Sequence, residues 1–191
     1  MISFAEFEIA LRGLLRLARF DANFTGFFDL SRDGARRSFR LALLLLLPVL
    51  FLWNLNSDLP DGADMVRVGL GELIGYALGW ICFPLILLSI ARLIDRESRI
   101  YGAIAIYNWL SILGVVLQFP IGIAAYFGLS DAWYGGISDL ALLFVTACEY
   151  FAFRRILEIR IEMVIALVVV DFILTHIIFA LMVGMIHNQL F

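Results

Sequence analysis

The sequence predicts an all-α membrane protein, a polytopic helix bundle of about five transmembrane helices preceded by an amphipathic interfacial helix. Hydrophobic residues make up 63% of the 191 residues and charged residues only 16%, whereas soluble domains average roughly 45–50% apolar residues. The charged residues also form clusters between long apolar stretches, as a polytopic protein requires because lipid cannot solvate charge. Both observations exclude an ordinary soluble domain.

The first element is an amphipathic helix near the amino terminus. Its apolar residues recur at spacings of three and four, and they are Phe4, Phe7, Leu11, Leu14, Leu15 and Ala18. Ser3 followed by Glu6 is typical of a capping box at its start. Arg12, Arg16 and Arg19 lie on the polar side, where an anionic membrane surface would attract them. The alternative is that this helix packs on the protein's own cytoplasmic ends, and the sequence favours neither.

Residues 1–38 form a cytoplasmic segment, and residues 39–191 form the transmembrane bundle. The connector carries Phe24, Phe27 and Phe28, which could anchor at the interface, and Ser31 is a candidate cap for the next helix. The expected spans are approximately 36–54, 66–91, 101–127, 137–153 and 163–186. The first is short, so its flanking arginines must reach the interface or its helix must tilt and bend at Pro48.

The distribution of arginine predicts the orientation of the bundle. All 14 basic residues are arginine, and short flanks rich in Lys or Arg stay in the cytoplasm. Seven arginines precede the first span, three follow the second span, and three lie between the fourth and fifth spans. Only Arg67 lies on the opposite side of the membrane, together with the acidic loop of Asp58, Asp61 and Asp64. We therefore expect a bacterial inner-membrane protein with a cytoplasmic amino terminus and an external carboxyl terminus.

The most specific motif is a stripe of glycines, Gly71, Gly75 and Gly79, on the second span. Such a GxxxGxxxG pattern lets another helix approach closely. The partner is either a second span of the same chain, which we favour, or another protomer. Pro48, Pro84 and Pro120 each lie inside a span, where a proline removes a backbone hydrogen bond and bends the helix.

Several polar residues lie inside the expected spans, where they are energetically costly. Counting helical rise from the arginines places Asn108, Glu149 and Asp171 at similar depths in the cytoplasmic half. We therefore expect a polar layer of Asn108, Ser111, Glu149 and Asp171, in which at least one acid is protonated and donates a hydrogen bond. Glu72, Gln118 and His176 are expected nearer the outer side. The layer is either a structural contact, which we favour, or a proton site.

The sequence contains no motif for catalysis or cofactor binding. HExxH, GxSxG and Walker patterns are missing, and Cys82 and Cys148 lie in separate apolar segments without metal-ligand spacing. We therefore expect no enzyme activity, no catalytic residues, no cofactor and no metal. A nucleic-acid partner is also not expected, because the basic residues border membrane segments.

An amphipathic amino terminus followed by five closely spaced spans resembles the Yip1-type membrane proteins. The strings FDLSRDGARRSF, ELIGYALGWICFP and YGAIAIYNW are also similar to those of uncharacterised bacterial membrane proteins of this length. The resemblance implies a membrane organising or trafficking type of role. We therefore expect an accessory protein that binds lipids and other membrane proteins through its glycine stripe and amphipathic helix, with a membrane-protein partner or a homo-oligomer as the assembly. The alternative is a small proton- or cation-coupled transporter or channel that uses the intramembrane acids.

Overall fold

The computed structural model describes residues 3–55, 59, 64–91 and 96–187, and these residues form helices without any strand. Five stretches are long and apolar enough to cross a membrane, so the all-α bundle is confirmed. The helices are α1 (Phe4–Leu17), the 3-10 helix η1 (Ala22–Phe27), α2 (Arg32–Ser38), α3 (Leu41–Leu55), α4 (Met65–Ile90), α5 (Glu97–Tyr126), α6 (Asp131–Leu157) and α7 (Ile161–Ile186). Asp58, Asp61 and Arg92 lie outside the described residues.

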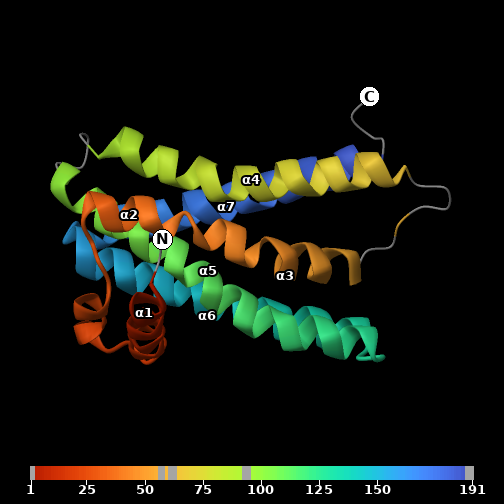
Figure 1. The fold of residues 1–191 in the computed structure, drawn as a ribbon, viewed down its shortest axis with the longest axis horizontal. Helices are drawn as coiled ribbons and strands as arrows, with labels where there is room; N and C mark the ends of the chain where they lie inside the picture. Colours follow the sequence, from red (N-terminus) through yellow and green to blue (C-terminus); the bar gives the residue numbers. More distant parts are fainter. Residues whose placement is uncertain (1–2, 56–58, 60–63, 92–95, 188–191) are drawn as a thin grey trace.

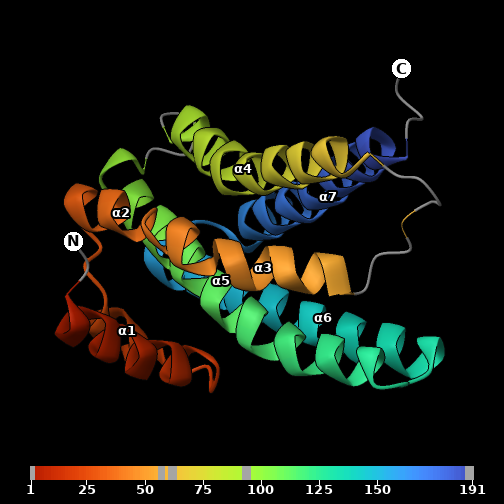
Figure 2. The ribbon, with the colours of Figure 1, turned by 45° about the vertical axis from the view of Figure 1, so that its right-hand side comes forward.

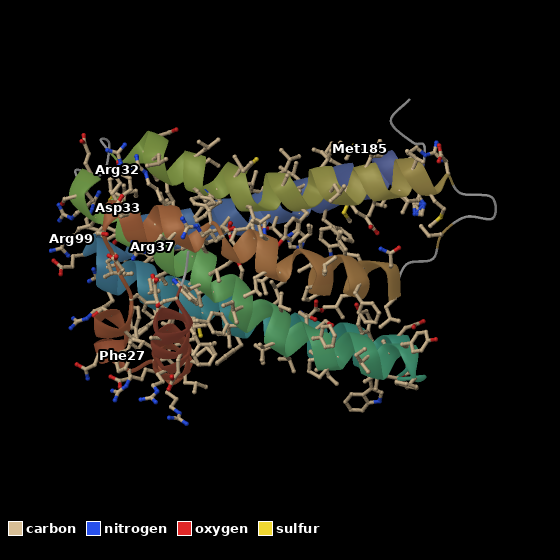
Figure 3. The ribbon with its side chains drawn as sticks, viewed as in Figure 1. Phe27, Arg32, Asp33, Arg37, Arg99 and Met185 are labelled. Carbon is tan, nitrogen blue, oxygen red and sulfur yellow. The ribbon has the colours of Figure 1, made fainter. Side chains whose placement is uncertain are left out.

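The spans form two antiparallel pairs with α3 between them. Helix α4 packs along α7, and α5 packs along α6. Helix α3 lies between the two pairs in both views and makes most of its contacts with α5 (Figures 1 and 2). One end of the bundle carries α1, α2 and most of the arginines, including Arg32, Arg37 and Arg99 (Figure 3). We call it the arginine-rich end, and Met185 on α7 marks the opposite end.

The first span differs from the expected continuous helix over residues 36–54. Helices α2 and α3 are separated by Phe39 and Arg40, and together they form the 24-residue apolar stretch Arg32–Leu55. The hydroxyl of Ser38 donates a hydrogen bond to the carbonyl oxygen of Ala35 at 2.7 Å. Such local side-chain bonds compete with the regular helical pattern, so the helix ends here.

The fourth span begins earlier than expected, at Asp131 instead of residue 137. Gly135 and Gly136, which the sequence placed in a loop, lie inside α6. A glycine costs a helix only about 1 kcal/mol relative to alanine, so two of them do not prevent the helix from forming. At the other end, α6 extends beyond the expected residue 153 to Leu157, and its C-cap residue Glu158 has a positive φ of 51°.

The protein core is concentrated toward the arginine-rich end. Helix α5 is the most buried span, and its first half contributes small residues such as Gly102, Ala103 and Ala105, which are buried against neighbouring helices. A Cβ atom at Gly102 would lie 3.1 Å from the Cβ atom of Leu30 and 3.3 Å from Ile156. Small side chains thus let α5 and α6 pack closely with the connector between η1 and α2.

Helix α1 lies crosswise to the spans, since Figure 1 shows it nearly end-on while the spans run along the long axis. Aromatic side chains of α1 and of the η1 region pack against α5 and α6. The ring of Trp109 on α5 lies 5.9 Å from the ring of Phe7 on α1 and 6.0 Å from that of Phe28 at the end of η1, measured between centroids. Phe24, expected at the interface, is instead fully buried and packs near Phe151. Phe27 lies beneath the guanidinium of Arg16.

The buried face of α1 differs from the expected apolar stripe. The buried residues are Ala10, Gly13, Leu14 and Leu17, whereas Phe4 is 84% and Leu15 58% exposed. The helix therefore does pack on the arginine-rich end of its own chain, and it also keeps an apolar surface outward. The oxygen of Ser3 accepts a hydrogen bond from the Glu6 N–H at 3.0 Å, as half of the expected capping box.

Candidate functional site

A hydrogen bond between side chains inside the bundle joins α5 to α7. The hydroxyl of Tyr107 donates a hydrogen bond to Oδ1 of Asp171 at 2.9 Å. The Tyr107 ring is held by Phe83 of α4, with the two centroids 4.8 Å apart. A buried tyrosine needs a partner for its hydroxyl, and here that partner is one of the expected intramembrane acids.

The second acid, Glu149 on α6, is only 5% exposed. It lies within electrostatic range of both Asp171 and Tyr107. Its Oε1 atom has no hydrogen-bond partner among the described residues. Asp171 itself is half-buried, and two charged carboxylates held close together inside a protein without a compensating cation are costly. The surroundings of this pair therefore favour binding of a proton or a cation, and we call Tyr107, Glu149 and Asp171 the acid cluster.

Asn108 and Ser111 do not hydrogen-bond to either acid. The Asn108 amide donates to Oγ of Ser38 at 2.9 Å, so it links α5 to α2. Ser111 lines a cavity next to Tyr107. Successive residues of a helix point about 100° apart, so Tyr107 and Asn108 reach different neighbours from the same depth. Depth counting from the arginines thus found both acids, but it missed Tyr107.

A cavity with three lobes lies in the half of the bundle away from the arginine-rich end. The lobes have volumes of about 440, 350 and 290 Å³, and Trp53 and Phe179 line all three. Most of the remaining lining is apolar and comes from α3, α4, α5, α6 and α7. Tyr107 lines the second lobe, so one member of the acid cluster contributes to the wall of this three-lobed cavity.

The polar residues expected near the outer side all line this cavity. Gln118 and His176 line the first lobe, and Glu72 lines the third. The Gln118 amide donates to the Ser138 carbonyl oxygen at 3.2 Å, and Glu72 accepts hydrogen bonds from the Asn54 amide at 3.0 and 3.1 Å. These residues come from three different spans, so the sequence alone could not predict that they line one cavity.

The glycine stripe is used mainly within the chain. A Cβ atom at Gly71 would lie 3.2 Å from Ile186, and one at Gly75 would lie 3.0 Å from Met182, both on α7. A Cβ atom at Gly79 would meet nothing within 4 Å, and this glycine lines the second lobe of the cavity. Gly71 and Gly75 therefore allow α4 to pack closely on α7, whereas Gly79 lines the cavity.

The arginines expected at the membrane surface all lie on exposed positions of α1 and the turn after it. Arg12 forms an ion pair with Glu8 at 2.6 Å, and Arg16 forms one with Asp21 at 2.7 Å. Arg19 is also exposed. Among the residues that the structure describes, no group of three or more His, Cys, Asp and Glu side chains is arranged to hold a metal ion.

Comparison of the sequence and the structure with known proteins did not identify a family for this chain. The sequence matches no protein-family model, and neither curated proteins nor solved structures gave a significant match. The resemblance to Yip1-type proteins therefore stays a prediction. The acid cluster and the three-lobed cavity beside it are the features of this chain that indicate a function.

Proposed function

We propose that the protein is a small proton-coupled membrane transporter or channel in which Glu149 and Asp171 share the translocated proton. One observation carries the proposal: the buried acid Glu149 of α6 and the half-buried acid Asp171 of α7 lie within electrostatic range of each other, and the tyrosine bonded to Asp171 also lines a cavity. A purely structural contact would have no need for the second carboxyl group or for its unpaired oxygen. A proton site makes use of both features.

The path to the acids runs through the three-lobed cavity. A proton from water in the cavity passes to Asp171 by way of the Tyr107 hydroxyl, which can donate one proton as it accepts another. Thr175 lies one helical turn from Asp171 on α7 and lines the same lobe as Tyr107. The route toward the arginine-rich end is closed by fully buried side chains such as Cys148, Ala152 and Phe153.

Release on the arginine-rich side therefore requires a movement of the helices. The prolines inside α3, α4 and α5 are Pro48, Pro84 and Pro120. Each removes a helical hydrogen bond and permits a local bend. In this proposal, the acids exchange protons with the cavity through Tyr107, the member of the acid cluster that lines it.

The test is proton flux in liposomes that contain the purified full chain and a pH-sensitive dye. An imposed pH gradient should collapse faster with the protein than without it, and Glu149→Gln and Asp171→Asn should each remove most of that increase. The matched control is Asp139→Asn, which changes an exposed acid on the same helix as Glu149 and should leave the flux unchanged. Flux that persists in both acid variants contradicts the proposal, as does a well-folded protein without any flux.

The accessory role is a second candidate, and the exposed side of α1 supports it. After docking, α1 still presents Phe4, Ile9 and Leu15, each about half exposed or more, beside exposed arginines. Such a surface suits insertion into a bilayer interface or contact with another membrane protein. A stoichiometric partner that co-purifies from native membranes, and that is lost in a Phe4→Ser and Leu15→Ser double variant, would favour this role.

A further inference from the structure

A second polar cavity lies at the arginine-rich end, between the start of α5 and the end of α6. Its volume is about 340 Å³, and its polar lining comes from Thr25, Ser98, Arg99, Arg155 and Glu158. A neighbouring cavity of about 390 Å³ shares Arg155 and Glu158 and adds Arg154, Ala22 and Phe151. We call the two together the basic pocket, whose lining combines arginines with apolar residues such as Leu30 and Phe151.

The charges of this pocket are only partly balanced by the protein. Arg99 forms an ion pair with Glu158 at 2.6 Å and donates to the carbonyl oxygen of Ile156 at 3.1 Å. Arg154 donates to the carbonyl oxygen of Ile159. Arg155 is exposed, and the described part of the chain gives it neither a hydrogen bond nor an ion pair. The lining thus contains three arginines and one glutamate, and Arg155 lies within electrostatic range of Glu158 without being bonded to it, so its guanidinium group can donate to a ligand.

The end of α6 is held in a conformation that keeps Glu158 at this pocket. Glu158 adopts left-handed φ and ψ of 51° and 43° at the C-cap, a position where helices usually place glycine or asparagine. The hydrogen bond from Arg99 lowers the pKa of its carboxyl below the usual 4.5. Glu158 therefore stays charged at neutral pH, fixes Arg99 and leaves Arg155 as the main site for an anion.

We propose that the basic pocket binds the phosphate headgroup of an anionic phospholipid, with Arg155 as its principal cationic contact. Arginine suits phosphate because its planar guanidinium group can donate two parallel hydrogen bonds. The Thr25 and Ser98 hydroxyl groups supply further donors at the same cavity. Basic pockets between helices at the cytoplasmic side of a bundle are a recurring form of lipid headgroup site.

The position of the pocket selects a lipid over a free anion. It lies where the α6 span ends, at the same end as the crosswise helix α1 (Figure 1). Phe151, on the wall of the second cavity, lies one turn of α6 farther into the span than Arg155. A lipid bound by its phosphate at Arg155 can therefore lay its acyl chains against the bundle, as free phosphate cannot.

The test measures binding of short-chain lipids to the purified full chain in a neutral detergent. The probes are dioctanoyl phosphatidylglycerol, dioctanoyl phosphatidylcholine and inorganic phosphate, and the readout is the Kd from calorimetric titration. Phosphatidylglycerol should bind to the wild type, and Arg155→Gln should weaken that binding about tenfold, the effect of losing one charge-assisted contact. The matched control is Arg36→Gln, an exposed arginine at the same end but outside the pocket, which should leave the Kd unchanged.

Two further variants keep the test decisive if Arg155→Gln proves unstable. Thr25→Val removes one hydroxyl donor and should weaken binding, whereas Glu158→Gln frees Arg99 and should tighten it. Equal losses in Arg155→Gln and Arg36→Gln would indicate a general charge effect and overturn the proposal. Equal affinity for phosphatidylcholine would overturn it too. Inorganic phosphate that binds as well as phosphatidylglycerol would assign the site to a free anion and exclude the lipid.

Discussion

Single residues control how the amino-terminal segment meets the bundle, and Gly34 is the tightest of them. A Cβ atom at Gly34 would lie 2.0 Å from the backbone carbonyl oxygen of Asp29, far closer than any contact allows. Asp29 also holds the chain in place through Oδ1, which accepts a hydrogen bond from the Ser31 N–H at 2.9 Å. The start of α2 therefore depends on a residue without a side chain.

We expect Gly34→Ala to lower the free energy of unfolding by about 1–3 kcal/mol, the usual cost of forcing extra atoms into a packed site. The control is Gly69→Ala on α4, where a Cβ atom would meet nothing within 4 Å. That change should stabilise the helix by up to about 1 kcal/mol. Melting temperatures in one detergent compare the two variants, and equal values would mean that the contact at Gly34 does not matter.

At the scale of elements, the structure shows which helix faces are used for packing. The sequence correctly predicted caps such as Ser31, whose Oγ accepts a hydrogen bond from Gly34 at 3.1 Å, because capping is a local interaction. It predicted the buried face of α1 only in part. Leu14 is buried and Phe7 packs on Trp109 as the apolar stripe predicts, but Phe4 and Leu15 are exposed, and the small residues Ala10 and Gly13 are buried in their place. Spans that are apolar on all sides carry no periodic signal for their partners, so Tyr107 could not be singled out.

The contact between α4 and α7 gives a second prediction, Gly75→Leu. A Cβ atom added at Gly75 would lie 3.0 Å from Cγ and Sδ of Met182. The larger side chain of leucine must therefore displace Met182 or separate the two helices. We expect a loss of about 1–3 kcal/mol, measured as thermal stability in detergent. Gly135→Leu on α6 is the control, since its Cβ has open space and its φ is not positive. Equal stability of the two variants would contradict the inference that the glycine stripe is needed for packing between α4 and α7.

The link between α1 and α2 should depend on pH. Arg37 donates to Oε1 of Glu6 at 3.2 Å and to Oδ2 of Asp29 at 2.6 Å. Hydrogen bonds from Ser31, and then the one from Arg37, hold the pKa of Asp29 below its ordinary 3.8. A carboxyl whose pKa is lowered by folding stabilises the fold above its unfolded pKa, and this contribution is lost as the pH falls through the folded value.

We therefore expect the melting temperature to fall as the pH is lowered from about 5 to about 3, with part of the fall due to Asp29. Asp29→Asn should melt lower than the wild type at about pH 5, and the difference should shrink toward about pH 3. Asp33→Asn in the first turn of α2, whose acid is 77% exposed and only weakly paired with Arg36 at 3.5 Å, is the control. A constant difference between wild type and Asp29→Asn across this range would contradict the assignment.

At the scale of the whole molecule, the two ends of the bundle have different characters. The arginine-rich end carries α1 and the basic pocket, whereas the three-lobed cavity lies in the other half. The sequence predicted the number of spans and the clustering of arginines, because length and charge pattern suffice for both. It could not predict the cavity, whose walls combine residues from five helices that are distant in sequence.

The orientation follows from the same clustering and can be checked by fusions. A reporter that is active only outside the cytoplasm should work after residue 191 and fail after Arg96 or Arg160, because arginine-rich flanks stay in the cytoplasm. The control is the same reporter fused after a secreted leader, which shows that it can be exported in these cells. Activity after Arg96 together with inactivity after residue 191 would mean that the bundle is inserted the other way round.

The crosswise position of α1 also has a consequence for biosynthesis. Its anchors, Trp109 on α5 and Phe144 and Phe151 on α6, contact Phe7 and Phe20 in the folded protein. The ribosome makes the chain from its amino terminus, so α1 emerges long before any of these anchors exists. Until the fourth span has been synthesised and inserted, the apolar side of α1 has no partner within the chain. The surface of the bilayer can accommodate both the arginines and the apolar residues of α1 during this time.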